Sequence, residues 1–306
     1  MIQRRIFLLF TAFFLLAAPC SFADGTNPYV LPLKIMSYNI RHGAGIDDVF
    51  DLDRTAGVIN KQAPDIVGLQ EVDSAGNRSK KIDETAYLAK ATGMYGTFGP
   101  AIPLGNGKYG VAILSKEKPI STKNIPLPGA EKRTLLVCEF EHYVFACTHL
   151  DLSEDRRLES IPIIIEEAAK WEKPFYICGD WNDTPGSKTI TQIKRSFTIL
   201  SRTTNVGSTS CYTFPADKPT SCIDYIAKYK KGTTKAPKTR EVIDEPAASD
   251  HRPILVELEL NITPQGIDTP LADDAPRPVY SLDGRPAGQH KQKGIYIIGK
   301  KKLFVK

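Results

Sequence analysis

Residues 177–187, ICGDWNDTPGS, contain the polar side chains best suited to chemistry in this chain. A short apolar run at 175–178 precedes Asp180 and Asn182, which stand two positions apart, and turn-forming residues follow at 184–186. Side chains two positions apart on a strand point the same way, so a carboxylate and an amide face one point at the strand's end. Open sheets bind ligands at such ends. A strand followed by an ordinary Asx turn is the alternative for this segment.

The same pattern, an apolar strand with polar side chains at one end, occurs at five other places. These strands are predicted at 33–38, 65–70, 143–149, 222–227 and 254–258. Their polar residues are, in chain order, Asn39, Glu71, His149, Asp224, and Asp250 with His251. A lone Glu or His at a strand end is usually solvated or held in the core. Six such ends indicate a shared edge.

Other elements follow from caps and periodicity. Asp51 or Asp53 caps a helix that ends at Lys61, before Pro64. A second helix spans 83–93 and ends in glycine, and a third spans 154–170 with an interruption at Pro162. A strand is expected at 109–115, and a hairpin joins 133–140 to 143–149.

Composition indicates a globular protein. The chain has 306 residues, of which 42% are hydrophobic and 25% charged, enough for one catalytic domain plus extensions. The whole chain carries +5; residues 1–23 contribute +2 and residues 280–306 contribute +6, so residues 24–279 carry about −3. A slightly acidic body argues against a protein built to grip long nucleic acid, which needs a basic stripe.

The N-terminus predicts export. Arg4 and Arg5 precede an apolar run at 6–18 and a small-x-small site at 21–23, which together are typical of a secretory signal at 1–23. A lipoprotein signal that uses Cys20 is the alternative. No second long apolar run follows, so no transmembrane segment is expected.

Five cysteines remain after residue 23, an odd number, so at least one is unpaired. Cys211 and Cys222 flank a proline-containing turn and could be bridged, and Cys138 and Cys147 could face each other across the hairpin. Cys178 is expected to be a small buried hydrophobe. No spacing indicates a zinc site.

The motifs SYNIRHG, LQEVD, THLDL, GDWNDTPGS, IDYI and SDHRPI occur in this order within about residues 32–260. In this the chain resembles the endonuclease/exonuclease/phosphatase superfamily of metal-dependent phosphoesterases. The resemblance implies an α/β (α+β) fold, a four-layer αββα sandwich of two mixed β-sheets flanked by helices, in a catalytic domain at 24–260. The predicted strands and helices agree with this fold.

The resemblance also implies a metal centre. Glu71 is its principal ligand, with Asn39 and Asp250 completing an oxygen-rich shell that suits Mg²⁺, or Mn²⁺ as a substitute. Asp180 orients and activates the attacking water, and Asn182 donates its amide to a phosphoryl oxygen.

The remaining implied groups bind the phosphate. His149 and His251 donate hydrogen bonds to it, and Asp224 orients His251. One departure concerns the metal: abasic-site nucleases have an acidic residue at the position of Arg41, which puts a two-metal scheme in doubt. Arg41 could bind a phosphate oxygen or be a surface residue.

Arg78 and Arg133 are weaker candidates for substrate contact, because both lie in predicted loops or at strand starts of the same domain. Beyond the domain, residues 261–278 are expected to be a linker, and residues 279–306 a small basic β tail with two short strands. The tail resembles the C-terminal extensions of exported Bacteroidetes proteins, some of which act as sorting signals; a solvated appendage is the alternative.

The predicted function is hydrolysis of phosphate esters by an exported, Mg²⁺-dependent phosphoric ester hydrolase, either a phosphodiesterase or a phosphatase. The expected partner is a phosphate-ester substrate, with nucleic acid possible but not favoured, and a monomer is expected. Alternatives are an extracellular nuclease, a sphingomyelinase-like phospholipase, or an inactive binding protein.

Overall fold

The computed structural model describes residues 28–204, 210–233 and 235–262, and short strands at 279–281, 286–287, 294–298 and 301–305. Residues Tyr29–Ile262 form one compact unit. The predicted signal at 1–23 and most of the predicted linker lie outside the described residues. None of the described helices has the length and apolar character that crossing a membrane requires.

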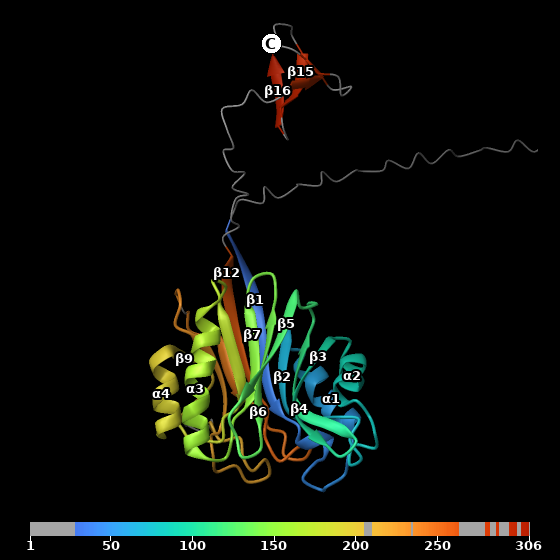
Figure 1. The fold of residues 1–306 in the computed structure, drawn as a ribbon, viewed down its shortest axis with the longest axis vertical. Coiled ribbons are helices and arrows are strands. Elements are labelled where there is room, and N and C mark those ends of the chain that lie inside the picture. The colour runs from blue at the N-terminus through green and yellow to red at the C-terminus, as the bar shows by residue number, and fades with distance from the viewer. Residues whose placement is uncertain are drawn as a thin grey trace, which may run out of the picture. The chain divides into compact units, whose positions relative to one another are not determined.

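The first sheet has six strands in the order β11-β12-β1-β2-β4-β3 (Figure 1). β1 is parallel to β2 and antiparallel to β12, so the sheet is mixed. The strands are β1 (Tyr29–Asn39), β2 (Ile66–Ser74), β3 (Tyr95–Leu104), β4 (Gly107–Ser115), β11 (Thr239–Val242) and β12 (Ile254–Ile262).

The second sheet also has six strands, in the order β5-β6-β7-β8-β10-β9, and is mixed because β7 and β8 are parallel. Its strands are β5 (Ser121–Leu127), β6 (Arg133–Glu139), β7 (Val144–His149), β8 (Phe175–Asp180), β9 (Phe197–Ile199) and β10 (Asp224–Tyr229).

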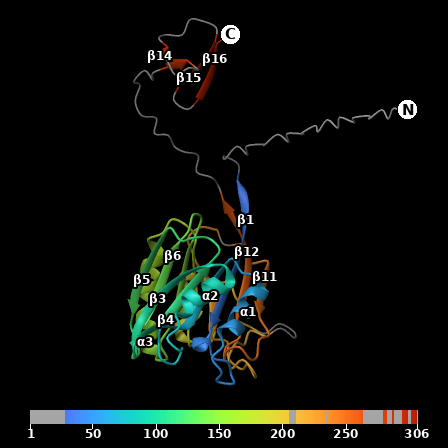
Figure 2. The ribbon, with the colours of Figure 1, turned by 90° about the vertical axis from the view of Figure 1, so that its right-hand side faces the viewer.

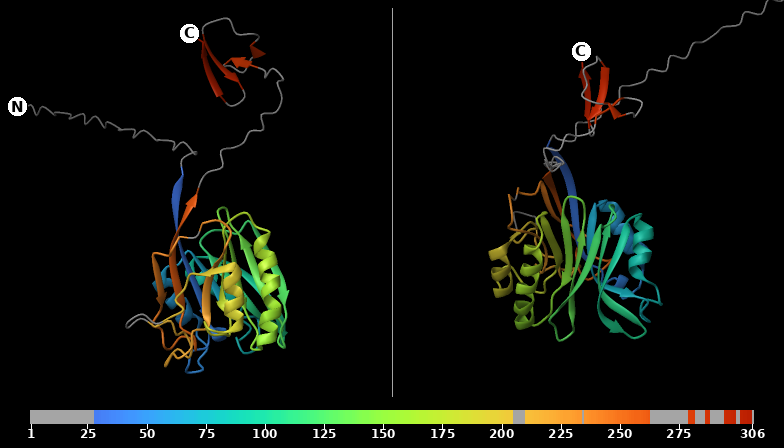
Figure 3. Two further views of the ribbon diagram at one scale, coloured as in Figure 1. Left: turned by 90° about the vertical axis from the view of Figure 1, so that its left-hand side faces the viewer. Right: turned by 45° about the horizontal axis from the view of Figure 1, so that its top comes forward.

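Two helices cover the outer face of each sheet. α1 (Leu52–Gln62) and α2 (Glu84–Thr92) lie on the first sheet (Figure 2), and α3 (Glu154–Ala169) and α4 (Lys188–Ser196) lie on the second (Figure 3). Asp51 and Asp83 cap the first two by accepting hydrogen bonds from backbone N–H groups of the first turn. The expected interruption at Pro162 is wrong: α3 continues through it, held by the buried Ile161 and Ile164 on either side.

Three apolar clusters lie between the four layers. One fills the space between the sheets, with Ile35 and Ile66 of the first facing Phe145 of the second. Another lies under α1 and α2, and the third under α3 and α4. Because each sheet is covered on both faces, its central strands are apolar on both sides. The predicted four-layer αββα sandwich is confirmed.

Two cysteines of the second sheet lie opposite a glycine of the first sheet, between the two sheets. Cys147 and Cys178 are neighbours on the parallel strands β7 and β8. Both face Gly68 of β2, where an added Cβ would collide with the Cys178 thiol, so the close approach of the sheets here requires glycine. Cys138 is two positions out of register with Cys147, and no disulfide occurs among the described cysteines.

The tail contains more strands than predicted. β13 (Val279–Ser281), β14 (Pro286–Ala287), β15 (Gly294–Ile298) and β16 (Lys301–Val305) form an antiparallel sheet in the order β14-β13-β15-β16. Before the tail, β12 runs to Ile262, so Asn261 and Ile262, which fall in the predicted linker, belong to the strand paired with β1.

Candidate active site at the shared edge of the two sheets

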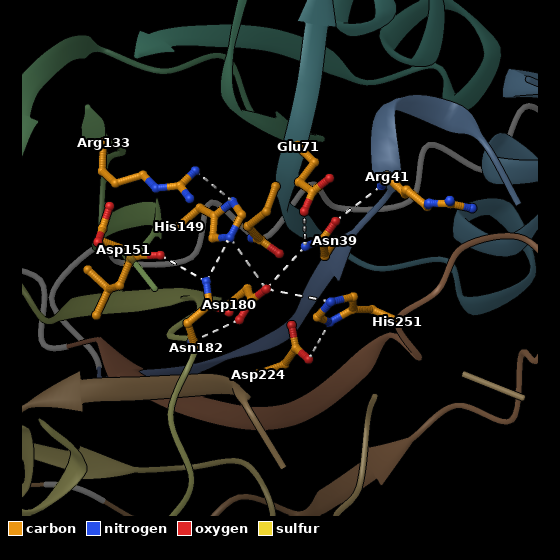
Figure 4. Close-up of polar contacts among 12 residues, drawn as sticks. Asn39, Arg41, Glu71, Arg133, His149, Asp151, Asp180, Asn182, Asp224 and His251 are labelled. Atoms are coloured by element: carbon orange, nitrogen blue, oxygen red, sulfur yellow. Dashed lines mark hydrogen bonds and ion pairs between the residues drawn. The ribbon is translucent and has the colours of Figure 1, made fainter. Parts of the chain in front are cut away.

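The predicted polar strand ends meet at one edge of the sandwich (Figure 4). In the second sheet, strand register places His149 and Asp224 on either side of Asp180. In the first sheet, Asn39 ends β1 beside Gln70 of β2. The predicted strand end at this point is wrong, because β2 continues through a bulge to Ser74 and Glu71 lies inside the strand. Because parallel strands of both sheets run toward this edge, residues far apart in the sequence become neighbours here.

Asn39 joins the two sheets. Its amide Nδ2 donates to Glu71 Oε1 and to Asp180 Oδ2, each at 3.1 Å, and its Oδ1 accepts from the backbone N–H of Arg41 at 3.1 Å. The side chain is fully buried, so these hydrogen bonds have no competing water. Asn39 therefore fixes the position of one carboxylate from each sheet.

A β-bulge directs Glu71 into this cluster. The pairing of β2 with β4 shifts between Leu69 and Val72, and Glu71 adopts a left-handed backbone with φ of 58°. Burial raises the pKa of Glu71; the hydrogen bond from Asn39 lowers it, and the negative charge of Asp250 raises it again. The site thus holds two carboxylates whose charges repel.

Asp224 and His251 form a buried pair next to Asp180. His251 Nδ1 lies 2.9 Å from Asp224 Oδ2, and its Nε2 lies 3.6 Å from Asp180 Oδ2. Burial by itself lowers the pKa of His251, but Asp224 and Asp180 outweigh it and raise the pKa to about 10. Burial raises the pKa of Asp180 to about 7, against the opposing charge of His251. The Phe214 ring covers His251, with centroids 4.8 Å apart.

The surroundings of His149 lower its pKa, whereas those of His251 raise its pKa. Its Nε2 lies 3.0 Å from Asn182 Nδ2 and 3.5 Å from Asp180 Oδ2, and its Nδ1 lies 3.5 Å from Arg133 Nη1. Burial, then Arg133, then His251 lower its pKa well below the usual range. Asn182 is held by hydrogen bonds from its amide to the Leu150 carbonyl and from its backbone N–H to Asp180. The site therefore contains one neutral and one cationic histidine.

Arg41 is already engaged by neighbouring groups. Its guanidinium forms an ion pair with Asp48 at 2.7 Å, donates to the Gly45 carbonyl at 2.7 Å and lies 3.8 Å from Asp250. These partners limit its capacity to bind another anion.

Arg78 and Arg133 each form an ion pair with an acidic side chain. Arg78 forms a bidentate ion pair with Asp73, and Arg133 donates to Glu131 Oε1 at 2.9 Å. Both guanidinium groups act electrostatically on their surroundings: Arg133 lowers the pKa of Glu71, and Glu71 raises that of Arg78.

The residues fit a hard cation. Glu71 and Asp250 offer carboxylate oxygens and Asn39 an amide oxygen, the ligand types that Mg²⁺ prefers. A cation between Glu71 and Asp250 would relieve the repulsion that raises the pKa of Glu71.

A different trio, Asp180, Asp224 and His251, brings potential ligand atoms within 4.8 Å of one another. His251 Nδ1 and Asp224 are already hydrogen-bonded to each other, and a cationic imidazole is no metal ligand. We therefore favour the Glu71 side of the site for a metal.

Three residues at the site were not identified from the sequence. Phe214 covers His251, Ser249 Oγ donates to the Asn39 carbonyl at 2.7 Å, and Tyr109 lies beside Arg78 and Arg133. Ser249 stands in the SDHRP motif and could have been found there. Phe214 and Tyr109 carry no chemical signal of their own, because apolar and aromatic residues are mostly core.

The two mixed sheets, each covered by helices, and their polar edge define a four-layer αββα sandwich. The model of the Endonuclease/Exonuclease/phosphatase family matches residues 36–251. The chain belongs to this family.

Solved structures of similar fold include three with informative descriptions. An endonuclease/exonuclease/phosphatase from Bacteroides vulgatus is 21% identical, with a TM-score of 0.61, covering 75% of this chain and 99% of that one. A mannosyl-6-phosphatase from Bacteroides thetaiotaomicron is 18% identical, with a TM-score of 0.59 and coverage of 74% and 99%. D. rerio TDP2, complexed with a single-strand DNA product, is 18% identical, with a TM-score of 0.58 and coverage of 75% and 99%. Among curated proteins no match was found.

Proposed function

We propose that this protein is an exported, divalent-metal-dependent hydrolase of phosphate esters in which water attacks phosphorus; the metal, when bound, would activate that water. The observation that carries the proposal is the position of Asn39, which holds Glu71 on one side and Asp180 on the other at 3.1 Å each. This arrangement supports a scheme in which Glu71 binds the metal and Asp180 activates the water at one substrate position. Family membership supports phosphoester chemistry.

Glu71, Asn39 and Asp250 are the proposed ligands of Mg²⁺, for which Mn²⁺ is a possible substitute. When bound, the ion would neutralise phosphate charge and favour the deprotonated water. The arginine at position 41 occupies the place of a further acidic ligand, so we propose a single-metal site.

The second sheet supplies the proton transfer and the hydrogen bonds to phosphate. Asp180 accepts the proton of the attacking water, and its raised pKa brings it closer to neutrality as a base. Asn182 donates its amide to a phosphoryl oxygen.

The two histidines complete the set of donors in different ways. The neutral His149 donates one hydrogen bond, and the cationic His251, held by Asp224, adds charge where negative charge develops.

A small substrate is favoured over a long nucleic acid, because residues 24–279 carry about −3 in total. The similarity to a TDP2 structure with a DNA product keeps a nuclease as the alternative. A sphingomyelinase-like phospholipase has no specific observation in its favour.

Activity screening tests the proposal. Purified protein with Mg²⁺, and the same protein with EDTA, are incubated with sugar, inositol and nucleotide phosphates, a single-stranded DNA and sphingomyelin vesicles. Metal-dependent turnover of a small phosphate ester is the expected result. Turnover that is unchanged in excess EDTA would contradict metal dependence, and turnover of DNA alone would favour the nuclease.

The predicted signal at 1–23 and the tail at 279–306 are proposed to serve export and sorting. Deleting residues 263–306 after the last residue of β12 removes no part of the site, so kcat and KM should stay within about twofold. Cell fractionation should show altered export or surface retention. A truncated protein that folds but loses activity would place the tail in the site.

A further inference from the structure

Two arginines near Tyr109, Arg78 and Arg133, are not used in the chemistry described above. The Arg78 guanidinium stacks over the Tyr109 ring, 5.5 Å from its centroid. Tyr109, Arg133 and His149 line one narrow gap, and Arg133 Nη1 lies 3.5 Å from His149 Nδ1.

Asp73 holds the Arg78 guanidinium in one orientation. Its Nε and Nη2 donate to Asp73 Oδ2 and Oδ1 at 2.7 and 2.8 Å, and Asp73 is fully buried. This bidentate contact uses Nε and Nη2, so Nη1, at the opposite edge of the guanidinium, makes no contact with Asp73. The Arg78 side chain is 42% exposed. An arginine held in this way is preorganised for a second anion, because little rotamer entropy is left to lose.

The loop that carries Arg78 is itself rigid. The backbone N–H of Ala75 donates to Ile82 O at 2.9 Å, and that of Lys81 donates to Gly76 O at 2.8 Å. These hydrogen bonds close the loop across its base, so the direction of Arg78 is set by the backbone as well as by Asp73.

Arg133 is less exposed but retains capacity. Its side chain is 8% exposed and its Nη1 contacts Glu131 and His149, while its Nε has no hydrogen-bond partner among the described residues. Arg41 differs from both, because Asp48, Asp250 and the Gly45 carbonyl already surround it.

We propose that Arg78 and Arg133, both near Tyr109, form a second anion subsite, and that the preferred substrate is a small phosphate ester carrying a second phosphate group. The inference rests on the proposed function, because it takes the scissile phosphate to lie at Glu71, Asp180 and Asn182. It adds that specificity comes from a second charge on the substrate, which Arg78 and Arg133 would bind.

A binding experiment tests the subsite without turnover. Calorimetry at fixed free Mg²⁺ compares methylphosphonate with alkane bisphosphonates that have one to four methylene groups between their phosphonates. At least one bisphosphonate should bind the wild-type protein about tenfold or more tightly than methylphosphonate, because the second contact is intramolecular. A series in which no bisphosphonate gains affinity would overturn the proposal.

Matched variants assign the gain to Arg78. Arg78→Gln should reduce it to less than about threefold, whereas Lys81→Gln, which removes the same charge from an exposed position of the same loop, should preserve it. A gain that survives in Arg78→Gln, or is lost equally in Lys81→Gln, rejects the subsite. If Arg78→Gln does not fold, because Asp73 is left buried and unpaired, Arg78→Lys retains the charge, loses the fork and should still lose most of the gain.

Kinetics separate this inference from the proposed function. For an enzyme that hydrolyses sugar phosphates, Arg78→Gln should raise KM for fructose 1,6-bisphosphate about tenfold and leave the KM for fructose 6-phosphate within about threefold. Hydrolysis with no such difference would overturn the inference alone. A bisphosphonate gain without any phosphoester hydrolysis would overturn the proposed function alone.

Discussion

The two sheets hold their parts of the active site by different means. In the first sheet, Glu71 occupies a bulge with φ of 58°, and Arg41 and His42 follow β1 with φ of 45° and 46°. Such left-handed conformations cost an L residue about 1–2 kcal/mol each. The first sheet thus departs from regular backbone at each of these positions.

In the second sheet, His149, Asp180 and Asp224 are ordinary strand residues placed side by side by register. Asn182 is left-handed, with φ of 51°, but asparagine tolerates this conformation better than glutamate. Regular register is enough to align groups that act together. Strain appears in the first sheet because alternation along β2 would otherwise direct Glu71 away from the site.

The largest effect on activity is expected for Glu71 of the first sheet. Glu71→Gln should reduce kcat/KM by about 10³-fold or more, because it would remove the proposed anionic metal ligand, whose contribution to transition-state stabilisation is expected to be several kcal/mol. Glu141→Gln, an exposed carboxylate in the β6–β7 turn, is the control and should change activity little. Steady-state kinetics with a melting curve measure both variants; a folded Glu71→Gln protein with full turnover would show that the first sheet is not the metal side.

The next largest effect on activity is expected for Asp180 of the second sheet. Asp180→Asn would remove the proposed general base, so kcat should fall by about 10²-fold or more while inorganic phosphate still binds. The new amide would also face Asn39 Nδ2, now 3.1 Å from Asp180 Oδ2, so folding is checked by circular dichroism. Loss of phosphate binding with unchanged kcat would assign Asp180 to substrate binding instead.

A smaller effect is expected for Asp224, which acts through His251. Asp224→Asn should lower kcat by about 10- to 100-fold, as for other partners that orient a histidine. In the double mutant with His251→Ala, the loss should barely exceed that of the worse single variant. Independent, multiplicative losses would mean that the two residues do not act as a pair.

The same pair predicts the alkaline limb of the pH–rate profile. The pKa of His251 is raised to about 10, so its charged form persists at neutral pH and is lost as pH rises through that value. Asp224→Asn removes the neighbouring negative charge, so the limb should move toward lower pH. An alkaline limb that stays in place would reject His251 as its source.

The smallest expected effect concerns backbone strain. Glu71→Gly removes the left-handed penalty but gains chain entropy in the unfolded state, so it should be more stable than Glu71→Gln by about 0.5–1 kcal/mol. Asn182→Gly should show less gain over wild-type Asn182, because asparagine already tolerates φ of 51°. Urea denaturation measures the three variants and the wild type, and equal gains at the two positions would show that strain does not distinguish the sheets.

The central strands of both sheets could be predicted from the sequence, and the edge strands could not. β1, β2, β4, β6, β7, β8, β10 and β12 were all expected, whereas β3, β5, β9 and β11 were missed. The missed strands are the four sheet edges. Edge strands are half-exposed and tolerate proline, as Pro100 of β3 and Pro126 of β5 show, so they lack a continuous apolar run. α4 was also missed, because residues 184–186 predict a turn, and Ser187, which caps α4, directly follows them.

The sequence by itself determined the chemistry available at the shared edge. Apolar runs that end in Asn39, Glu71, His149 and Asp180 require only the burial of strands and the exposure of their ends, which local composition encodes. The short-range pattern therefore predicted the candidate residues, and the family resemblance of the motifs that contain them implied the fold class.

Only the tertiary structure decided how those groups are arranged and charged. The bulge at Glu71, the cover of Phe214 over His251 and the contact of Arg78 with Tyr109 each depend on residues distant in the sequence. Burial and neighbouring charges then give the two histidines opposite protonation states. These properties arise from desolvation and Coulomb interactions across the packed sheets, which no single segment of the chain contains.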